Sequence, residues 1–232
     1  MNLNKESKQE ISQAIGDLYR ATRRVNILAG NESLDKNRFG TQLAAVEEEM
    51  QELIDGYEDN NLGLIIDATI DSLVTVSELI SIIDGNDSII QDNPIPKHLN
   101  LYDRNVEQLI NHAVDNFNND NYIDLLGNLE DLCVVLNCPI CENIYSVIES
   151  NNSKFITVKE LDESTETEFS ICEAIESEGR YEDVYSETVD YQGEEYIVFK
   201  SKYDKKNDKK FTKGKFVKPL GFFKEPTIVV YG

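Results

Sequence analysis

The chain has 232 residues, of which 40% are apolar, and a formal net charge of −22 at pH 7. This length allows one or two domains with a buried core, while the large negative charge argues against nucleic acid binding by the surface as a whole. No apolar run approaches the ~18 residues of a membrane-spanning helix, and Met1 to Gln9 contains no apolar signal core. We therefore expect a cytoplasmic protein without a membrane or nucleic acid partner.

The first two thirds of the chain have the apolar periodicity of amphipathic helices. Predicted helices cover residues 8–29, 41–58, 62–83, about 103–118, 121–137 and 139–150. A polar break from Gly30 to Gly40 separates the first two, and a loop with one glycine and two prolines, Asp84 to Lys97, follows the third. Short connections favour antiparallel neighbours, so residues 1–153 are expected to form a four-helix-bundle-like, all-α domain.

The helix pair at 41–83 resembles the pair at 103–137, which suggests an internal duplication. Glu52 aligns with Gln108, and Asp71 aligns with Asp131. The two separations, 19 and 23 residues, differ by four residues, or about one helical turn. The second copy lacks most of the acids of the first.

The character of the sequence changes after Asn152, where residues 154–232 are expected to form a small α+β extension. The predicted elements are a short helix around Phe169 to Ile175 and strands at Val184 to Val189 and Glu195 to Ser201. Gln192-Gly193 between the strands indicates a hairpin turn. The predicted fold class is therefore mainly α, with an α+β appendage.

Lysines are concentrated in this extension. Nine lysines and two acids, Asp204 and Asp208, lie between Lys200 and Lys218. Because long like-charge runs are usually solvated, the stretch is interpreted either as a solubilising basic tail or as a source of phosphate contacts.

The four cysteines are expected to be free thiols in a reducing cytosol. Cys138 and Cys141 form a single C-x-x-C, but His98 and His112 are not spaced around it as zinc ligands. Zinc binding and redox chemistry are therefore disfavoured.

Acidic residues on the second predicted helix are the first candidates for chemistry. Residues three apart share one side of a helix, so Glu49 and Glu52 point the same way. Glu49 flanks the apolar stripe, whereas Glu48 points mostly away from it. Taken alone, the acidic run is equally typical of a solvated helix face.

The third predicted helix favours a cation site. Asp67 and Asp71 lie four residues apart in an otherwise apolar helix, where Asp is a poor helix former and costly to bury. No basic residue occurs from Met50 to Pro96. Oxygen ligands from Asp and Glu suit Mg²⁺ or Mn²⁺, and paired carboxylate sites of this kind commonly handle phosphates.

These residues form a recognisable pattern, Glu48-Glu49-x-x-Glu52-Leu53 followed by Asp67-Ala-x-x-Asp71-x-Leu-Val-x-Val. The pattern resembles the signature of the all-α nucleoside triphosphate pyrophosphohydrolases, which include MazG-like proteins, phosphoribosyl-ATP pyrophosphohydrolases and dimeric dUTPases. The second half of that signature is normally E-x-x-D. Its Glu falls here on Leu64 or Ala68, so the Asp67–Asp71 pair would take its place.

Two later segments resemble MazG-like proteins of bacteriophage type. One runs from Ser150 to Phe155 and is similar to their S-N-M-S-K-F segment, and the other runs from Gly214 to Pro226 and is similar to their closing motif. The resemblance covers about residues 40–80 and 145–226, in pieces. It implies assembly as a dimer or tetramer, in the host cytoplasm if the protein is phage-encoded.

The resemblance implies Mg²⁺-dependent hydrolysis of a nucleoside or deoxynucleoside triphosphate to the monophosphate and pyrophosphate, as in nucleotide-pool control. The implied metal ligands are Glu49, Glu52, Asp67 and Asp71, and Glu48 or Glu49 would act as general base. The candidate substrate-binding residues are Asn151, Lys154, Lys200, Lys202 and Lys218. For Asn151, a helix C-terminal cap is the alternative.

Two other functions stay open. One is a protein of the same fold that binds nucleotides or another protein without catalysis, as the non-acidic Leu64 and Ala68 would suggest. The other is a phosphoribosyl-ATP pyrophosphohydrolase, which the phage-type C-terminal segment disfavours.

Overall fold

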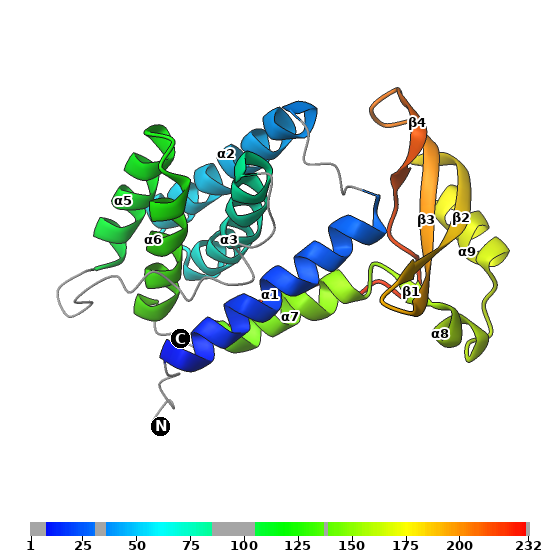
Figure 1. Ribbon diagram of the computed structural model, residues 1–232, viewed down its shortest axis with the longest axis horizontal. Coiled ribbons are helices and arrows are strands. Elements are labelled where there is room, and N and C mark those ends of the chain that lie inside the picture. The colour runs from blue at the N-terminus through cyan, green and yellow to red at the C-terminus, as the bar shows by residue number, and fades with distance from the viewer. Residues whose placement is uncertain (1–7, 31–35, 85–104, 137–138, 231–232) are drawn as a thin grey trace. The chain divides into compact units, whose positions relative to one another are not determined.

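The computed structural model describes residues 8–30, 36–84, 105–136 and 139–230. It is mainly helical with an antiparallel sheet near the C-terminus (Figure 1), which confirms the predicted fold class. The chain divides into two compact units. The helical unit comprises Met1–Arg23, Ser33–Ile148 and Pro226–Gly232, and the second unit comprises Arg24–Glu32 and Glu149–Glu225.

The helical unit contains the predicted helices with small shifts at their ends. They are α1 (Lys8–Leu28), α2 (Lys36–Glu58), α3 (Leu62–Asp84), α5 (Val106–Asn118), α6 (Tyr122–Val135) and α7 (Ile140–Asn152). The polar break predicted up to Gly40 is too long, because α2 already begins at Lys36. Phe39 extends the apolar side of α2 by one turn and packs against the core with Leu43. Along the described ranges, none of the helices has the length and apolar character needed to cross a membrane.

Two antiparallel helical hairpins, α2–α3 and α5–α6, pack against each other through α3 and α6 (Figure 1). Their apolar sides share one core with residues of α1 and α7. Fully buried residues of this core include Leu18, Leu53, Ile66, Ile70, Leu73, Leu125, Leu129 and Ile144.

The turns of the two hairpins have the same structure. Asn60 and Asp120 both adopt left-handed backbone conformations, with φ of 52° and 58°. Around them, the amides of residues 59, 60 and 61 donate to the carbonyls of residues 55, 57 and 56, and the amides of 119, 120 and 121 donate to those of 115, 117 and 116. Every counterpart therefore lies 60 residues further along the chain.

This constant offset relates the two hairpins position by position. Asp71 corresponds to Asp131, as expected. The predicted alignment of Glu52 with Gln108 is wrong by about one helical turn, because the uninterrupted helices place His112 opposite Glu52. Sequence similarity alone did not distinguish the two registers, since both bring polar residues into alignment.

The C-terminal segment belongs to the helical unit rather than to the extension. The fully buried Asn143 side chain accepts a hydrogen bond from the amide of Val229 (2.7 Å) and donates one to its carbonyl (3.0 Å). Ile228 packs against the helical core. Hydrogen bonds between one side chain and a distant backbone segment leave no periodic pattern in the sequence, so the sequence does not predict this contact.

The second unit contains an antiparallel sheet and two short helices. Its elements are β1 (Ile156–Thr157), α8 (Val158–Asp162), α9 (Glu168–Ser177), β2 (Tyr181–Tyr191), β3 (Glu194–Asp204) and β4 (Lys209–Phe216). β3 is central, with β2 on one side and both β1 and β4 on the other. The hairpin turn at Gln192-Gly193 is confirmed, since both residues have positive φ, as a type I′ turn requires.

Both faces of the middle of β3 are buried, so Tyr196 to Phe199 form a continuous apolar run rather than an alternating one. Phe199 packs with Ile171 of α9 on one face. Val198 packs with Leu28 and Phe155 on the other.

The lysine-rich stretch predicted as a possible tail is largely part of the sheet. It forms the end of β3, a turn, and the edge strand β4. Asp204 anchors this hairpin: its fully buried carboxylate accepts hydrogen bonds from Arg180 (3.2 Å) and Asn207 (3.0 Å) and pairs with Lys215 (3.4 Å). The hydrogen bond from Arg180, with those from Asn207, holds the pKa of Asp204 at about 2.

Asp204→Asn tests whether this carboxylate stabilises the second unit. Because its pKa is depressed below the ordinary 3.8, the stabilisation is present above that value and is lost as the pH falls toward 2. We expect the variant to melt several degrees below the native protein at neutral pH, with a difference that shrinks below about pH 4. Asp183→Asn, at an exposed position that also has positive φ, should leave the melting temperature unchanged. A difference that stayed constant down to pH 2 would contradict the assignment.

Candidate functional site

Helices α2 and α3 bring four carboxylates into one region. Glu49 and Glu52 come from α2, and Asp67 and Asp71 come from α3. All four are partly exposed, whereas their neighbours on the core side are buried. The carboxylates therefore flank the interface of the hairpin at the edge of the core, where water is only partly excluded.

Electrostatic coupling shows how close these groups are. Burial raises the pKa of Glu49 to about 8, and so do the negative charges of Asp71, Glu52, Glu48 and Asp67, in that order. Coulomb interactions weaken with distance and with exposure to water, so all five predicted acids share one neighbourhood. Burial also raises the pKa of Asp67. Glu48 itself is exposed, as its place on the helical wheel predicted.

Within the described ranges, no basic side chain forms an ion pair with Glu49, Glu52 or Asp67. Arg38 of α2 is instead paired with Glu78 of α3 (3.1 Å), and both side chains are largely buried. Partly buried carboxylates without a counter-charge destabilise the fold. This part of the hairpin would therefore be stabilised by an added cation.

Glu78 is a residue that the sequence analysis missed. It lies seven residues after Asp71, so about two helical turns place it on the same side of α3. An acid in an otherwise apolar helix was the available signal. Its ion pair with Arg38 and the hydrogen bond from Gln42 to the Thr75 carbonyl (2.9 Å) join α2 and α3 beyond the carboxylates.

The donor chemistry of the four carboxylates fits a hard divalent cation, since every donor is an oxygen and a positive charge would reduce their mutual repulsion. Their side chains are not already grouped for binding, however. Over the described residues, no three or more His, Cys, Asp or Glu side chains lie close enough together to hold a metal ion. A cation would thus have to draw the carboxylates together.

Helix geometry shows that one of the two possible glutamate positions, that of Ala68, is closed to a ligand. Asp67 and Asp71 are four residues apart and lie about 40° from each other around α3. Ala68 is fully buried on the core side. A glutamate at position 68 would have to enter the apolar core, so the position cannot supply a ligand in this chain.

The second hairpin does not repeat the carboxylate group. At the 60-residue offset, the positions of Glu49, Glu52, Asp67 and Asp71 correspond, in that order, to those of Leu109, His112, Gly127 and Asp131. Leu109 is fully buried, so its position has joined the apolar core. Of these four corresponding residues only Asp131 is acidic, so the candidate site is confined to the first hairpin.

The predicted substrate-binding residues all belong to the second unit. Asn151 is buried and accepts a hydrogen bond from Lys154 Nζ (2.6 Å). This bond ties the two residues into one local structure at the end of α7. The predicted C-terminal capping role of Asn151 and its predicted ligand contact are both compatible with that position.

The other three lysines differ in availability. Lys200 is buried and paired with Glu187, so its charge is already compensated. Lys202 is exposed, with Nζ 5.5 Å from the centre of the Tyr185 ring. Lys218 is also exposed, lies 3.8 Å from the centre of the Phe223 ring and forms a solvent-exposed ion pair with Glu225 (3.9 Å). Lys202 and Lys218 are therefore the more accessible sources of positive charge.

Cys133, Cys141 and Cys172 have free thiols, as expected. Cys138 and His98 lie outside the described residues, so the C-x-x-C stays a sequence observation.

No family model, curated protein or solved structure matches this chain. The similarity to MazG-like proteins therefore rests on the motifs quoted above and stays a prediction.

Glu49→Gln tests the coupling of the carboxylates. With a pKa of about 8 against an ordinary 4.5, the folded protein keeps a proton that the unfolded chain has lost, so native stability declines as the pH rises between these values. Glutamine imitates the protonated form. Without divalent cations, the variant should melt several degrees above the native protein at about pH 9 and should match it near pH 4.5. Glu47→Gln, which changes an exposed acid of the same helix, is the control. Identical pH profiles for the two variants would show that Glu49 is not specially coupled.

Proposed function

We propose that this chain is a Mg²⁺-dependent hydrolase that converts a nucleoside or deoxynucleoside triphosphate into the monophosphate and pyrophosphate. The observation that carries the proposal is the gathering of Glu49, Glu52, Asp67 and Asp71 on adjoining sides of α2 and α3. Carboxylates brought together in this way offer oxygen ligands suited to divalent cations, and cations so held attract phosphates. The sequence motifs support the same reaction independently.

In this proposal the four carboxylates hold the metal, and Mn²⁺ would replace Mg²⁺. When bound, such ions neutralise triphosphate charge and favour ionisation of a water molecule. The oxygen of that water bonds to the α-phosphorus, the bond from the α-phosphorus to the bridging oxygen breaks, and pyrophosphate leaves with the bonding electrons. Glu48, exposed and adjacent to Glu49, would accept the proton of the attacking water.

A triphosphate substrate would also need basic groups near its phosphates. The helical unit is so rich in acids that a triphosphate would be repelled without metal ions and basic groups. Lys202, Lys218 and Lys154 are the candidates, with Asn151 as a possible contact to base or sugar. Lys200 would contribute only after breaking its pair with Glu187.

A nucleotide-binding or protein-interaction role without catalysis is the second candidate. Two observations favour it: no closed metal-binding group exists among the described residues, and the position of the family's glutamate is held by Leu64 or by the buried Ala68. The two functions differ in turnover, which the following measurements test.

Metal binding should stabilise the native fold. We expect millimolar Mg²⁺ or Mn²⁺ to raise the melting temperature, and to do so less as the pH falls below about 8, where Glu49 keeps its proton and competes with the ion. Asp67→Asn should reduce the shift. Asp59→Asn, an exposed turn position whose counterpart in the second hairpin is Asn119, should preserve it. Calorimetry that showed no metal-dependent shift in the native protein would exclude the proposed site.

Asp71→Asn should abolish most turnover. Loss of one proposed ligand is expected to lower kcat by about 100-fold or more, while circular dichroism remains helical. The assay supplies each triphosphate with Mg²⁺ and measures monophosphate and pyrophosphate, which should form in equal amounts; Asp59→Asn is again the control. Native-like turnover by Asp71→Asn, or release of orthophosphate with a diphosphate, would contradict the mechanism. Metal binding without any turnover would favour the second candidate.

A further inference from the structure

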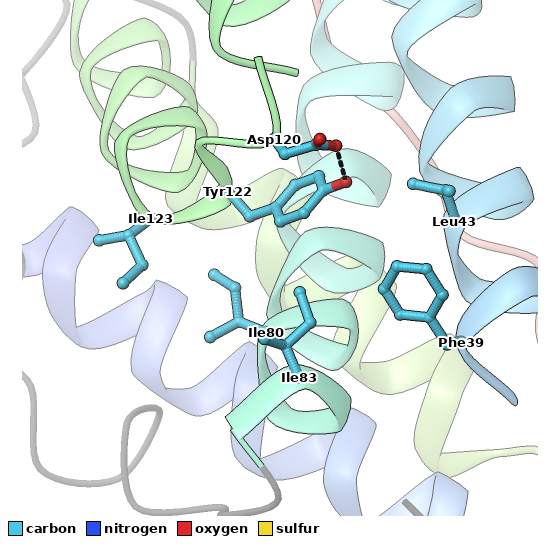
Figure 2. A pocket seen from close by; sticks show the side chains of 7 residues that line it. All are labelled: Phe39, Leu43, Ile80, Ile83, Asp120, Tyr122 and Ile123. Carbon is cyan, nitrogen blue, oxygen red and sulfur yellow. Dashed lines mark hydrogen bonds between the residues drawn. The ribbon is translucent and has the colours of Figure 1, made fainter. Parts of the chain in front are cut away.

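A separate apolar pocket of about 610 Å³ lies at the open end of the α2–α3 hairpin, against the turn between α5 and α6 (Figure 2). This volume falls within the range of about 300–1,000 Å³ typical of small-molecule sites. Its described lining consists of Phe39, Leu43, Ile80, Ile83, Asp120, Tyr122 and Ile123. The described lining thus comprises two aromatic rings, four aliphatic side chains and a single carboxylate.

The pocket's polar feature is a hydrogen-bonded pair. The Tyr122 hydroxyl donates to Asp120 Oδ1 (2.7 Å), and Figure 2 shows the two groups pointing toward each other. Burial and this hydrogen bond raise the pKa of Tyr122 to about 12, so the hydroxyl remains a donor. In the part of the chain that the structure covers, no basic side chain pairs with Asp120. The carboxylate keeps acceptor capacity for a ligand.

The pocket is distinct from the carboxylate site. Ile80 follows Asp71 by nine residues, which places it about 180° away around α3. Leu43 precedes Glu49 by six residues, which places it about 120° away around α2. A nucleotide bound by the carboxylates would therefore lie on another side of the hairpin.

We infer that this pocket binds a small hydrophobic cation, with its apolar body against Phe39, Ile80 and Ile123 and its ammonium or amidinium group at Asp120. Such a ligand would cover Ile83 and Ile123, whose exposed fractions of 49% and 55% are high for isoleucine. Its charge would also interact favourably with the faces of the aromatic rings.

Charge selects a cation over other ligands of the same size. Between Lys36 and Ile148 the sequence contains 21 acids and four basic residues, so an anion would be repelled. A neutral apolar ligand would remove water from Asp120 without supplying a partner, which is unfavourable. A cationic ligand fills the apolar volume and pairs with the carboxylate.

The corresponding turn of the α2–α3 hairpin shows that this backbone conformation does not require the Asp120–Tyr122 hydrogen bond. In the first hairpin, Asn60 and Leu62 occupy the positions of Asp120 and Tyr122. Asn60 adopts the same left-handed conformation as Asp120. Asp120→Asn should therefore preserve the turn while removing the charge.

The test uses the full chain and three probes that share a phenyl ring: 2-phenylethylammonium, neutral 2-phenylethanol and anionic 3-phenylpropionate. Titration calorimetry, with amide chemical shifts to locate the site, should give the ammonium probe at least a tenfold lower Kd than the alcohol. Asp120→Asn should weaken the ammonium probe about tenfold and leave the alcohol unchanged. Asp124→Asn removes an exposed acid four residues away that does not line the pocket, and should bind like the native protein.

Equal affinities for the ammonium and the alcohol would overturn the inference. So would equal losses in Asp120→Asn and Asp124→Asn, or no binding of the ammonium probe at millimolar concentration. Melting temperatures of both variants establish that each is folded. None of these outcomes depends on hydrolysis of a triphosphate.

Discussion

The burial of α3 is the constraint on which the helical unit depends. This helix is apolar over most of its circumference, with Ile65, Ile66, Ala68, Ile70, Leu73, Val76, Leu79 and Ile80 all buried. A helix with so little polar surface needs partners on several sides, and α2 and α6 provide them. One narrow strip remains accessible beside α2, and it carries Asp67 and Asp71. The packing of apolar residues thus determines where the acids lie.

Placing these acids close together has a cost, which is seen in the raised pKa of Glu49 on the adjoining helix α2. Burial and the neighbouring negative charges raise the pKa of its carboxyl group to about 8, so these acids do not stabilise the hairpin. Glu78, on the same side of α3, is instead paired with Arg38. A structural role would favour the arrangement seen at Glu78 for every acid. Glu49, Glu52 and Asp67, which form no ion pair among the described residues, are therefore the stronger functional candidates, in keeping with the general association of perturbed groups and functional sites.

The two hairpins have one turn structure and different surface chemistry. Their turns share the same hydrogen bonds and left-handed residues, whereas their side chains serve different purposes. The first hairpin carries acids where the second has Leu109 and Gly127. The second carries Asp120 and Tyr122 beside a pocket, where the first has Asn60 and Leu62. The backbone geometry of the turn is the same in both hairpins, whereas their surface side chains differ.

The sequence by itself determined the helices, the hairpin turn at Gln192-Gly193 and the neighbourhood of Glu49, Glu52, Asp67 and Asp71. These features depend on local periodicity and on helix geometry, which link residues only a few positions apart. Tertiary structure alone decided the partnership of Asn143 with Val229, the incorporation of the lysine-rich stretch into β4, and the pocket at Asp120. Each of these joins segments distant in sequence, and no local pattern encodes such a contact. The residue-by-residue correspondence of the two hairpins also needed the structure, because hydrogen bonds of the turns identify equivalent residues where similar side chains do not.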